Sequence, residues 1–169
     1  MHAPLPSQPD AHGVRFGLVV SRYHDAIVGR LAEGAARTFL AAGGDERDLL
    51  RIDAPGTYEL PVVAAALLRR GDVDAVVTLG LVLTGETTHD RYICDSVAHA
   101  LQELAIETGK PAAFGVLTCQ TMAQAEARAG GAKGNKGEEA MGAALLAIAS
   151  VRSAETAPTR RRPTRRRST

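Results

Sequence analysis

The chain has 169 residues, a formal net charge of +1 at pH 7 and 45% hydrophobic residues. This length suits one domain with a sizeable core. Residues 1–13 do not resemble a signal peptide, and no continuous apolar stretch is long enough to cross a membrane. Cys94 and Cys119 match no zinc or disulfide spacing, so we expect a reducing cytoplasm as the setting and no membrane partner.

Basic residues are concentrated at the end of the chain. Residues 158–169 hold six of the 20 lysines and arginines and no acidic residue, which leaves 14 basic against 19 acidic residues elsewhere. The body therefore carries about −5 and the tail about +6. We expect a flexible N-terminal arm over residues 1–13, one domain over residues 14–153 and a disordered, Arg-rich tail over residues 154–169.

The first half of the chain alternates strand-like and helix-like patterns. Residues 14–20 form an apolar run that predicts a buried strand, and a helix capped by Asp25 follows until the glycine pair 43–44. Residues 49–52 predict a short strand, and a second helix begins near Tyr58. One face of the first helix repeats apolar residues at every fourth position: Ile27, Leu31, Ala35 and Phe39.

The second half continues this alternation. Its expected elements are, in order, a strand over 76–83, a helix over 90–108, a strand over 113–118, a helix capped by Thr121 and ending near Arg128, a flexible basic loop over 130–137 and a helix ending near Val151. Strands that alternate with helices indicate a parallel sheet. The predicted fold is therefore α/β, a doubly wound sheet of four parallel strands flanked by helices on both faces.

Polar and aromatic side chains follow the predicted strands. Ligands of open parallel α/β sheets bind beyond the carboxyl ends of the strands, so residues gathered there are placed to meet them. Because all four strands agree, we expect a ligand site at that edge of the sheet. The residues are Tyr23 and His24 after the first strand, Thr57, Tyr58 and Glu59 after the second, Glu86, Thr87, Thr88 and His89 after the third, and Phe114 with Thr118 on the fourth.

Residues 86–89 offer the richest chemistry of these groups. Thr87, Thr88 and the unpaired N–H groups that open the next helix suit an anion. His89 could transfer a proton near neutral pH, because an unperturbed imidazole titrates at about 6.5. A helix-capping or surface histidine explains the same position, so the sequence pattern leaves both interpretations open.

The other candidates have structural alternatives as well. Glu59 suits the first turn of a helix as well as a ligand, and Tyr23 and Phe114 could pack in the core or stack on a heterocycle. Arg128 and Lys136 lie near glycines that let a backbone approach an anion, although a solvated basic loop also explains them. P-loop, dinucleotide and G-x-S-x-G motifs are absent from the sequence, and schemes with a serine nucleophile or a metal find no support.

Five ordered segments resemble one family. They are V-V-S-R-Y-H (19–24), P-G-T-Y-E-L-P (55–61), L-G-L-V-L-T-G-E-T-T-H (79–89), F-G-V-L-T (114–118) and R-A-G-G-A-K-G-N-K-G (128–137). They are similar to the motifs of the 6,7-dimethyl-8-ribityllumazine synthases, over about residues 14–151. The resemblance implies a flavodoxin-like fold and a transferase without cofactor or metal. That transferase condenses 5-amino-6-(D-ribitylamino)uracil with 3,4-dihydroxy-2-butanone 4-phosphate in the penultimate step of riboflavin biosynthesis.

The resemblance also implies how the pyrimidine substrate is held. Tyr23 would stack on the pyrimidine ring, and Phe114 of a neighbouring subunit would form part of the pocket wall. Contacts to the uracil and its ribityl chain would come from two further groups, Thr57, Tyr58 and Glu59, and Leu81, Val82 and Leu83.

The phosphorylated substrate would meet a second set of residues. Glu86 and Thr87 would hold the butanone, Arg128 would bind its phosphate, and Lys136 would add positive charge nearby. His89 would be the proton donor, which makes His89, Arg128 and Lys136 the expected catalytic residues. This chain departs from the family pattern after the histidine, where Asp90-Arg91-Tyr92 replaces an aromatic residue followed by Asp-Tyr. It also has His24 where Asn is frequent, and Tyr23 in place of Phe or Trp.

Assembly follows from the same resemblance. It implies a pentamer with active sites shared between subunits, and the compact loop 130–137 favours a 60-subunit icosahedral shell over a free pentamer. Riboflavin synthase is a further expected partner. We interpret the Arg-rich tail as a disordered, solubilising end, or alternatively as a segment that binds anionic cargo or nucleic acid. Two other functions stay open, a flavin- or lumazine-binding module that lost the reaction and a structural cage protein.

Overall fold

The computed structural model describes residues 8–158. Its main sheet contains four parallel strands in the order β2-β1-β3-β4. This arrangement confirms the predicted α/β sheet of four parallel strands. The strands are β1 (Phe16–Ser21), β2 (Leu49–Ala54), β3 (Ala75–Leu83) and β4 (Ala112–Cys119).

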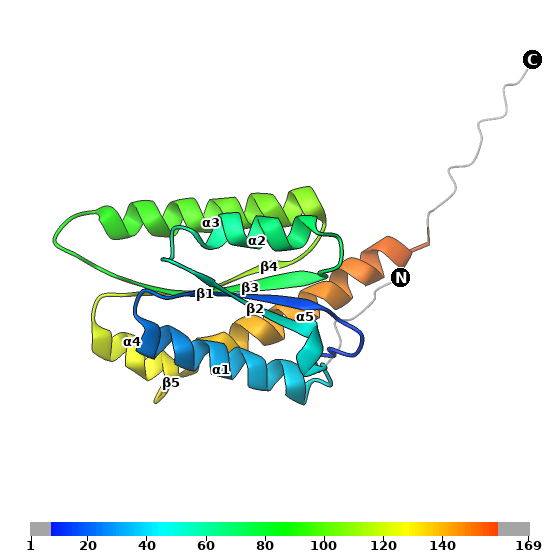
Figure 1. The fold of residues 1–169 in the computed structure, drawn as a ribbon, viewed down its shortest axis with the longest axis horizontal. Coiled ribbons are helices and arrows are strands. Elements are labelled where there is room, and N and C mark those ends of the chain that lie inside the picture. Colours follow the sequence, from blue (N-terminus) through cyan, green and yellow to red (C-terminus); the bar gives the residue numbers. More distant parts are fainter. Residues whose placement is uncertain (1–7, 159–169) are drawn as a thin grey trace, which may run out of the picture.

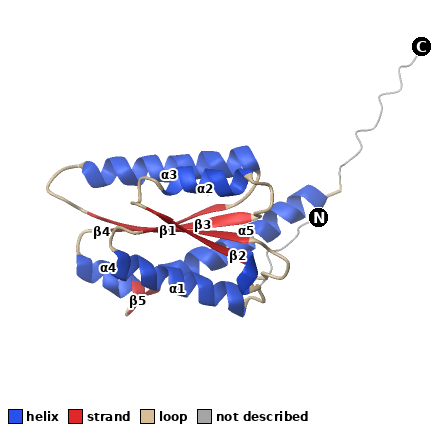
Figure 2. Ribbon diagram, viewed as in Figure 1, coloured by secondary structure: helices blue, strands red, loops and turns tan. Residues whose placement is uncertain are grey.

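Helices cover both faces of this sheet (Figures 1 and 2). Helices α2 and α3 lie on one face, and α1, α4 and α5 lie on the other. A short 3-10 helix, Glu46–Asp48, leads into β2. The helices are α1 (Asp25–Ala41), α2 (Leu60–Arg69), α3 (His89–Thr108), α4 (Met122–Arg128) and α5 (Lys136–Thr156). Within the described residues, no helix is both long enough and apolar enough to cross a membrane.

The two central strands divide the interior into two cores. Every residue of β1 is buried, and so is nearly all of β3. Because successive side chains of a strand point to opposite faces, Leu18 and Val20 join the core beneath α1 and α5, while Val19 joins the core beneath α2 and α3. The predicted apolar face of α1 is buried in the first of these cores.

Residues 129–137 form a more ordered segment than the predicted flexible loop. The short strands β5 (Ala129–Gly131) and β6 (Gly134–Asn135) pair antiparallel there. Asn135 is buried, and its side-chain oxygen accepts hydrogen bonds from the backbone N–H groups of Gly137 at 2.8 Å and Glu138 at 3.4 Å. Its amide nitrogen donates to the carbonyl of Arg30 at 2.9 Å, which ties the start of α5 to α1.

The ends of the chain differ in detail from the prediction. Ala11 is fully buried and its N–H donates to the carbonyl of Ala42 at 2.9 Å, so part of the expected arm packs on the body. Helix α5 continues to Thr156, beyond the predicted end near Val151. Residues 1–7 and the arginines of 159–169 lie outside the described residues.

Two predicted helix caps have different outcomes. Thr121 caps α4 as predicted, because its hydroxyl accepts a hydrogen bond from the N–H of Gln124 at 3.3 Å. The predicted cap of α1 is wrong. Asp25 is the first residue of that helix, and His24 occupies the capping position with a left-handed backbone and no side-chain cap bond.

Candidate active site

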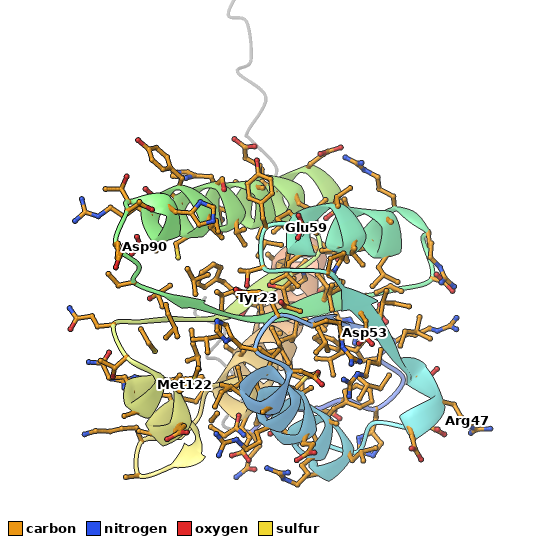
Figure 3. The ribbon with its side chains drawn as sticks, turned by 60° about the vertical axis from the view of Figure 1, so that its left-hand side comes forward. Tyr23, Arg47, Asp53, Glu59, Asp90 and Met122 are labelled. Carbon is orange, nitrogen blue, oxygen red and sulfur yellow. The ribbon has the colours of Figure 1, made fainter. Side chains whose placement is uncertain are left out.

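A cavity of about 480 Å³ opens at the carboxyl ends of β1, β2 and β3. The loops after β1 and β2, the end of β3 and the start of α3 form its walls. Figure 3 shows Tyr23, Glu59 and Asp90 at this edge. Its volume is typical of a small-molecule site. Eight predicted residues line this carboxyl-edge cavity: Tyr23, Thr57, Tyr58, Glu59, Leu81, Val82, Leu83 and His89.

Tyr23 lies at the mouth of this cavity with 67% of its surface exposed. Its backbone N–H donates to the hydroxyl of the buried Ser21 at 3.3 Å. The buried, apolar Leu81 and Val82 of β3 line the same cavity. A flat, exposed aromatic ring beside an apolar wall suits a planar heterocycle.

Thr57 connects the β2 loop to the central strand. Only 6% of it is exposed, and its hydroxyl donates to the carbonyl of Leu81 at 3.4 Å. A side chain at Gly80 would come within 2.7 Å of that hydroxyl, so the glycine makes room for Thr57 against β3. The position of the β2 loop, and of Tyr58 and Glu59 in it, therefore depends on close packing with the centre of the sheet.

Glu59 lies at the N-terminus of α2 and is half-buried. Its side chain makes no capping hydrogen bond, and none of the ion pairs within residues 8–158 involves it. A carboxylate at a helix N-terminus interacts favourably with the helix dipole. Glu59 is therefore an acceptor directed by its loop into the carboxyl-edge cavity rather than a member of a salt bridge.

His89 begins α3 and is exposed on the wall of the same cavity. Thr88 occupies the capping position without a side-chain hydrogen bond, which leaves its hydroxyl and the first N–H groups of the helix to other partners. Glu86 and Thr87 are exposed in the loop between Gly85 and His89 and lie outside the cavity lining. The structure thus brings His89 to the predicted site and leaves Glu86 and Thr87 at its margin.

The remaining predicted residues line a different cavity. This cationic cavity, of about 410 Å³, lies between β4 and the start of α5 and contains Phe114, Arg128 and Lys136. An Nη atom of Arg128 donates to the carbonyl of Gln124 at 3.0 Å. The Nζ atom of Lys136 pairs with a carboxylate oxygen of Glu139 at 2.5 Å.

The prediction that Phe114 lies at the carboxyl edge is wrong. Phe114 is the third residue of β4 and pairs in register with Thr78, whereas Leu83 and Cys119 form the carboxyl end of that strand pair. At about 3.3 Å per residue, five residues separate Phe114 from that end by roughly 16 Å. Its ring is 40% exposed, in the cationic cavity.

The thiol groups near these sites are not activated. Burial raises the pKa of the Cys119 thiol, which lines the cationic cavity, and the Arg128 guanidinium opposes that rise. Burial, together with the carboxylates of Asp90 and Asp95, raises the pKa of the Cys94 thiol. Both cysteines are free. They stay protonated near neutral pH, so neither has the thiolate that a cysteine nucleophile requires.

Ile93 and Glu139 were outside the predicted site, whereas His24 was expected at the carboxyl edge after the first strand. His24 and Ile93 line the carboxyl-edge cavity, and Glu139 lines the cationic cavity. Helical spacing could have found two of them, because Ile93 lies four residues after His89 and Glu139 lies three after Lys136. His24 directly follows Tyr23 and was expected beside it, and the fold confirms that both residues line one cavity.

An open parallel α/β sheet with a ring, a carboxylate and an imidazole around a cavity at its carboxyl edge places this protein in the class of flavodoxin-like proteins with a small-molecule site. The family model described as 6,7-dimethyl-8-ribityllumazine synthase matches residues 13–152. The chain belongs to this family, whose members are transferases of riboflavin biosynthesis.

Individual relatives agree over most of the chain. A 6,7-dimethyl-8-ribityllumazine synthase of Aquifex aeolicus is 46% identical over 138 residues, which cover 82% of this chain and 88% of the relative. A synthase of the same name from Thermus thermophilus is 44% identical over 135 residues, which cover 80% of this chain and 86% of the relative. A synthase of the same name from Streptomyces coelicolor is 44% identical over 153 residues, which cover 89% of this chain and 93% of the relative.

Proposed function

We propose that this protein condenses 5-amino-6-(D-ribitylamino)uracil with 3,4-dihydroxy-2-butanone 4-phosphate to give 6,7-dimethyl-8-ribityllumazine, phosphate and water. Its membership of the 6,7-dimethyl-8-ribityllumazine synthase family, and its similarity to the three relatives of that name, support this proposal. The structural observation that carries it is the carboxyl-edge cavity, which combines the exposed ring of Tyr23, the carboxylate of Glu59 and the imidazole of His89.

The pyrimidine substrate fits the carboxyl-edge cavity best. Its planar ring would lie on Tyr23 beside the apolar Leu81 and Val82. The polar groups of Thr57, Tyr58 and Glu59 would then meet the ring edge and the hydroxyl groups of the ribityl chain. A carboxylate without an ion-pair partner is suited to accept hydrogen bonds from such hydroxyl groups.

The phosphate group fits the cationic cavity. Arg128 and Lys136 supply its positive charge, whereas no lysine or arginine lines the carboxyl-edge cavity within the described residues. A guanidinium binds phosphate oxygens through paired N–H donors. Glu86 and Thr87, in the loop beside the carboxyl-edge cavity, would contact the carbon chain of this substrate.

A complete site therefore needs both cavities. We propose that the carboxyl-edge cavity of one subunit meets the cationic cavity of its neighbour, so that Phe114, Arg128 and Lys136 all come from the neighbouring chain. This division supports a pentamer with sites shared between subunits. The compact hairpin at residues 129–135 agrees with the further proposal of a 60-subunit shell, which light scattering of the purified protein would test.

The reaction requires proton transfer and orientation from the protein. An amine nitrogen of the pyrimidine forms a C–N bond with the ketone carbon and one water is lost. Phosphate leaves with the electrons of its C–O bond as a carbon-bound proton is removed, and the resulting enol tautomerises to a carbonyl. The second nitrogen attacks this carbonyl, which closes the ring and releases a second water. Orienting two reactants can lower the barrier by about 7–11 kcal/mol. His89, as proton donor, would add roughly 10²–10⁴-fold.

The experiment that tests the function uses the purified full chain with both substrates. Lumazine fluorescence that increases in proportion to protein concentration supports the proposal. No product at high protein concentration, from a preparation shown to be folded and oligomeric, would contradict it. Omitting each substrate in turn is the matched control, because neither compound alone can give the lumazine.

Further parts of the proposal concern surroundings and partners. The free cysteines agree with the reducing cytoplasm that we propose as its location. The Arg-rich tail, which lies outside the described residues, would act as a solubilising end or would dock anionic cargo or nucleic acid. Riboflavin synthase is the protein partner that we propose, because it would consume the lumazine product.

A further inference from the structure

His24 has an unusual backbone conformation. Its φ of 61° and ψ of 43° are left-handed, and every other described residue with positive φ is a glycine. Histidine enters this region more readily than most residues, but at some cost in free energy. The first turn of α1 holds it there, because the His24 carbonyl accepts hydrogen bonds from the N–H groups of Ile27 at 2.9 Å and Val28 at 3.1 Å.

The imidazole of His24 does not cap α1; it contacts Tyr23 instead. The two ring centroids are 4.7 Å apart, and the ring planes make an angle of 70°. Edge-to-face contacts of this kind are favourable for aromatic rings. Both rings line the carboxyl-edge cavity. The left-handed backbone therefore places a second ring where it restricts the first.

Tyr23 needs such a restraint because little else surrounds it. It is 67% exposed, and the hydrogen bond from its N–H to Ser21 fixes its backbone but not its ring. A stacking surface that is free to rotate must be ordered when the ligand binds, which reduces affinity. A ring already held in place avoids that loss.

We propose that His24 is a positioning residue, which holds the Tyr23 ring ready to stack on the pyrimidine substrate. This inference rests on the proposed function and deepens it. It assigns His24 to one substrate only, because the phosphate-binding groups Arg128 and Lys136 line the other cavity. The contribution of His24 to pyrimidine binding comes from its imidazole ring, and not from its backbone conformation alone.

Three variants separate the ring from the backbone. His24→Gly and His24→Asn accept the left-handed conformation but remove the ring, whereas His24→Phe keeps a ring. For the Gly and Asn variants we expect the KM for the pyrimidine to rise about 2- to 10-fold, which corresponds to ordering one side chain. The KM for the butanone phosphate and kcat should change less than about two-fold, and His24→Phe should restore the pyrimidine KM.

The control is His99→Asn, which alters an exposed histidine of α3 whose ring pairs with the Asp95 carbonyl at 2.7 Å. All kinetic constants of this variant should match those of the unaltered protein. An unchanged pyrimidine KM in the His24→Gly variant would overturn the inference. A normal pyrimidine KM in the His24→Asn variant, together with a raised KM in the His24→Gly variant, would also overturn it. The His24→Gly and His24→Asn variants test the inference even where His24→Phe fails to fold. Failure of the proposed function would appear differently, as no product from the unaltered protein.

Discussion

The two cavities differ in the chemistry that they contain. The carboxyl-edge cavity has an exposed ring, a carboxylate and an imidazole, whereas the cationic cavity has an arginine, a lysine and a second exposed ring. Under the proposed function each cavity has half of what the condensation needs, because the first suits a planar, hydroxyl-rich molecule and the second suits a phosphate. The difference supports the proposal that one subunit binds the two substrates in separate cavities, and that a neighbouring subunit brings them together.

The largest expected effect comes from the cationic cavity. Arg128→Ala removes the guanidinium proposed to hold the phosphate, and we expect kcat/KM to fall about 10³-fold, the upper range for loss of one charge-stabilising donor. Steady-state fluorescence kinetics with both substrates varied would measure it. Arg128→Lys is the matched control, since it keeps the charge without the paired donors and should lose less.

A smaller loss of activity is expected from a substitution in the carboxyl-edge cavity. His89→Ala removes the proposed proton donor, and kcat should fall about 10²-fold, at the lower end of general acid–base contributions because solvent can replace the proton. The KM values should change little. If His89→Ala abolished turnover while Arg128→Ala left it intact, the assignment of orientation to one cavity and proton transfer to the other would be wrong.

Mixing the two variants tests the division between subunits directly. The His89→Ala and Arg128→Ala chains would be co-expressed. The Arg128→Ala subunit keeps an intact carboxyl-edge cavity, and the His89→Ala subunit keeps an intact cationic cavity, so a neighbouring pair of the two can form one complete site. Random mixing in a symmetric ring should restore activity at about a quarter of the sites. Activity no higher than that of the better parent would show instead that both groups act within one subunit.

The smallest effect concerns the ion pair inside the cationic cavity. Glu139 pairs with Lys136, and both side chains are substantially exposed, at 58% and 41%. Such a pair contributes at most about 1 kcal/mol. Glu139→Gln frees Lys136 for the phosphate, so we expect the KM for the butanone phosphate to fall by up to about five-fold, with the pyrimidine KM unchanged. A rise in that KM would show that Glu139 orients Lys136 rather than competing for it.

Much of the carboxyl-edge cavity could be predicted from the sequence. Alternating patterns predict the strands, and the rule that ligands bind beyond strand ends selects Tyr23, Glu59 and His89. The resemblance to a family added the apolar residues Leu81, Val82 and Leu83 and the role of each group. Local patterns succeeded here because these residues lie on or next to the elements that position them.

The cationic cavity was harder to predict. Phe114 was assigned with Thr118 to the end of the fourth strand, yet the register of β4 against β3 places it opposite Thr78. The hairpin after α4 looked like a flexible glycine-rich loop because its order depends on Asn135, whose amide reaches the Arg30 carbonyl 105 residues earlier in the chain. Neither strand register nor such a distant contact leaves a local signal.

The sequence by itself determined the α/β order of elements, the family and most residues that line the carboxyl-edge cavity, since periodic burial and strand-end chemistry are encoded in consecutive residues. Only the tertiary structure decided that His24 turns its ring onto Tyr23, that Arg128 and Lys136 share a cavity with Phe114, and that this cavity is separate from His89. Those facts depend on backbone handedness and on packing between elements distant in the chain, which no local pattern of side chains records.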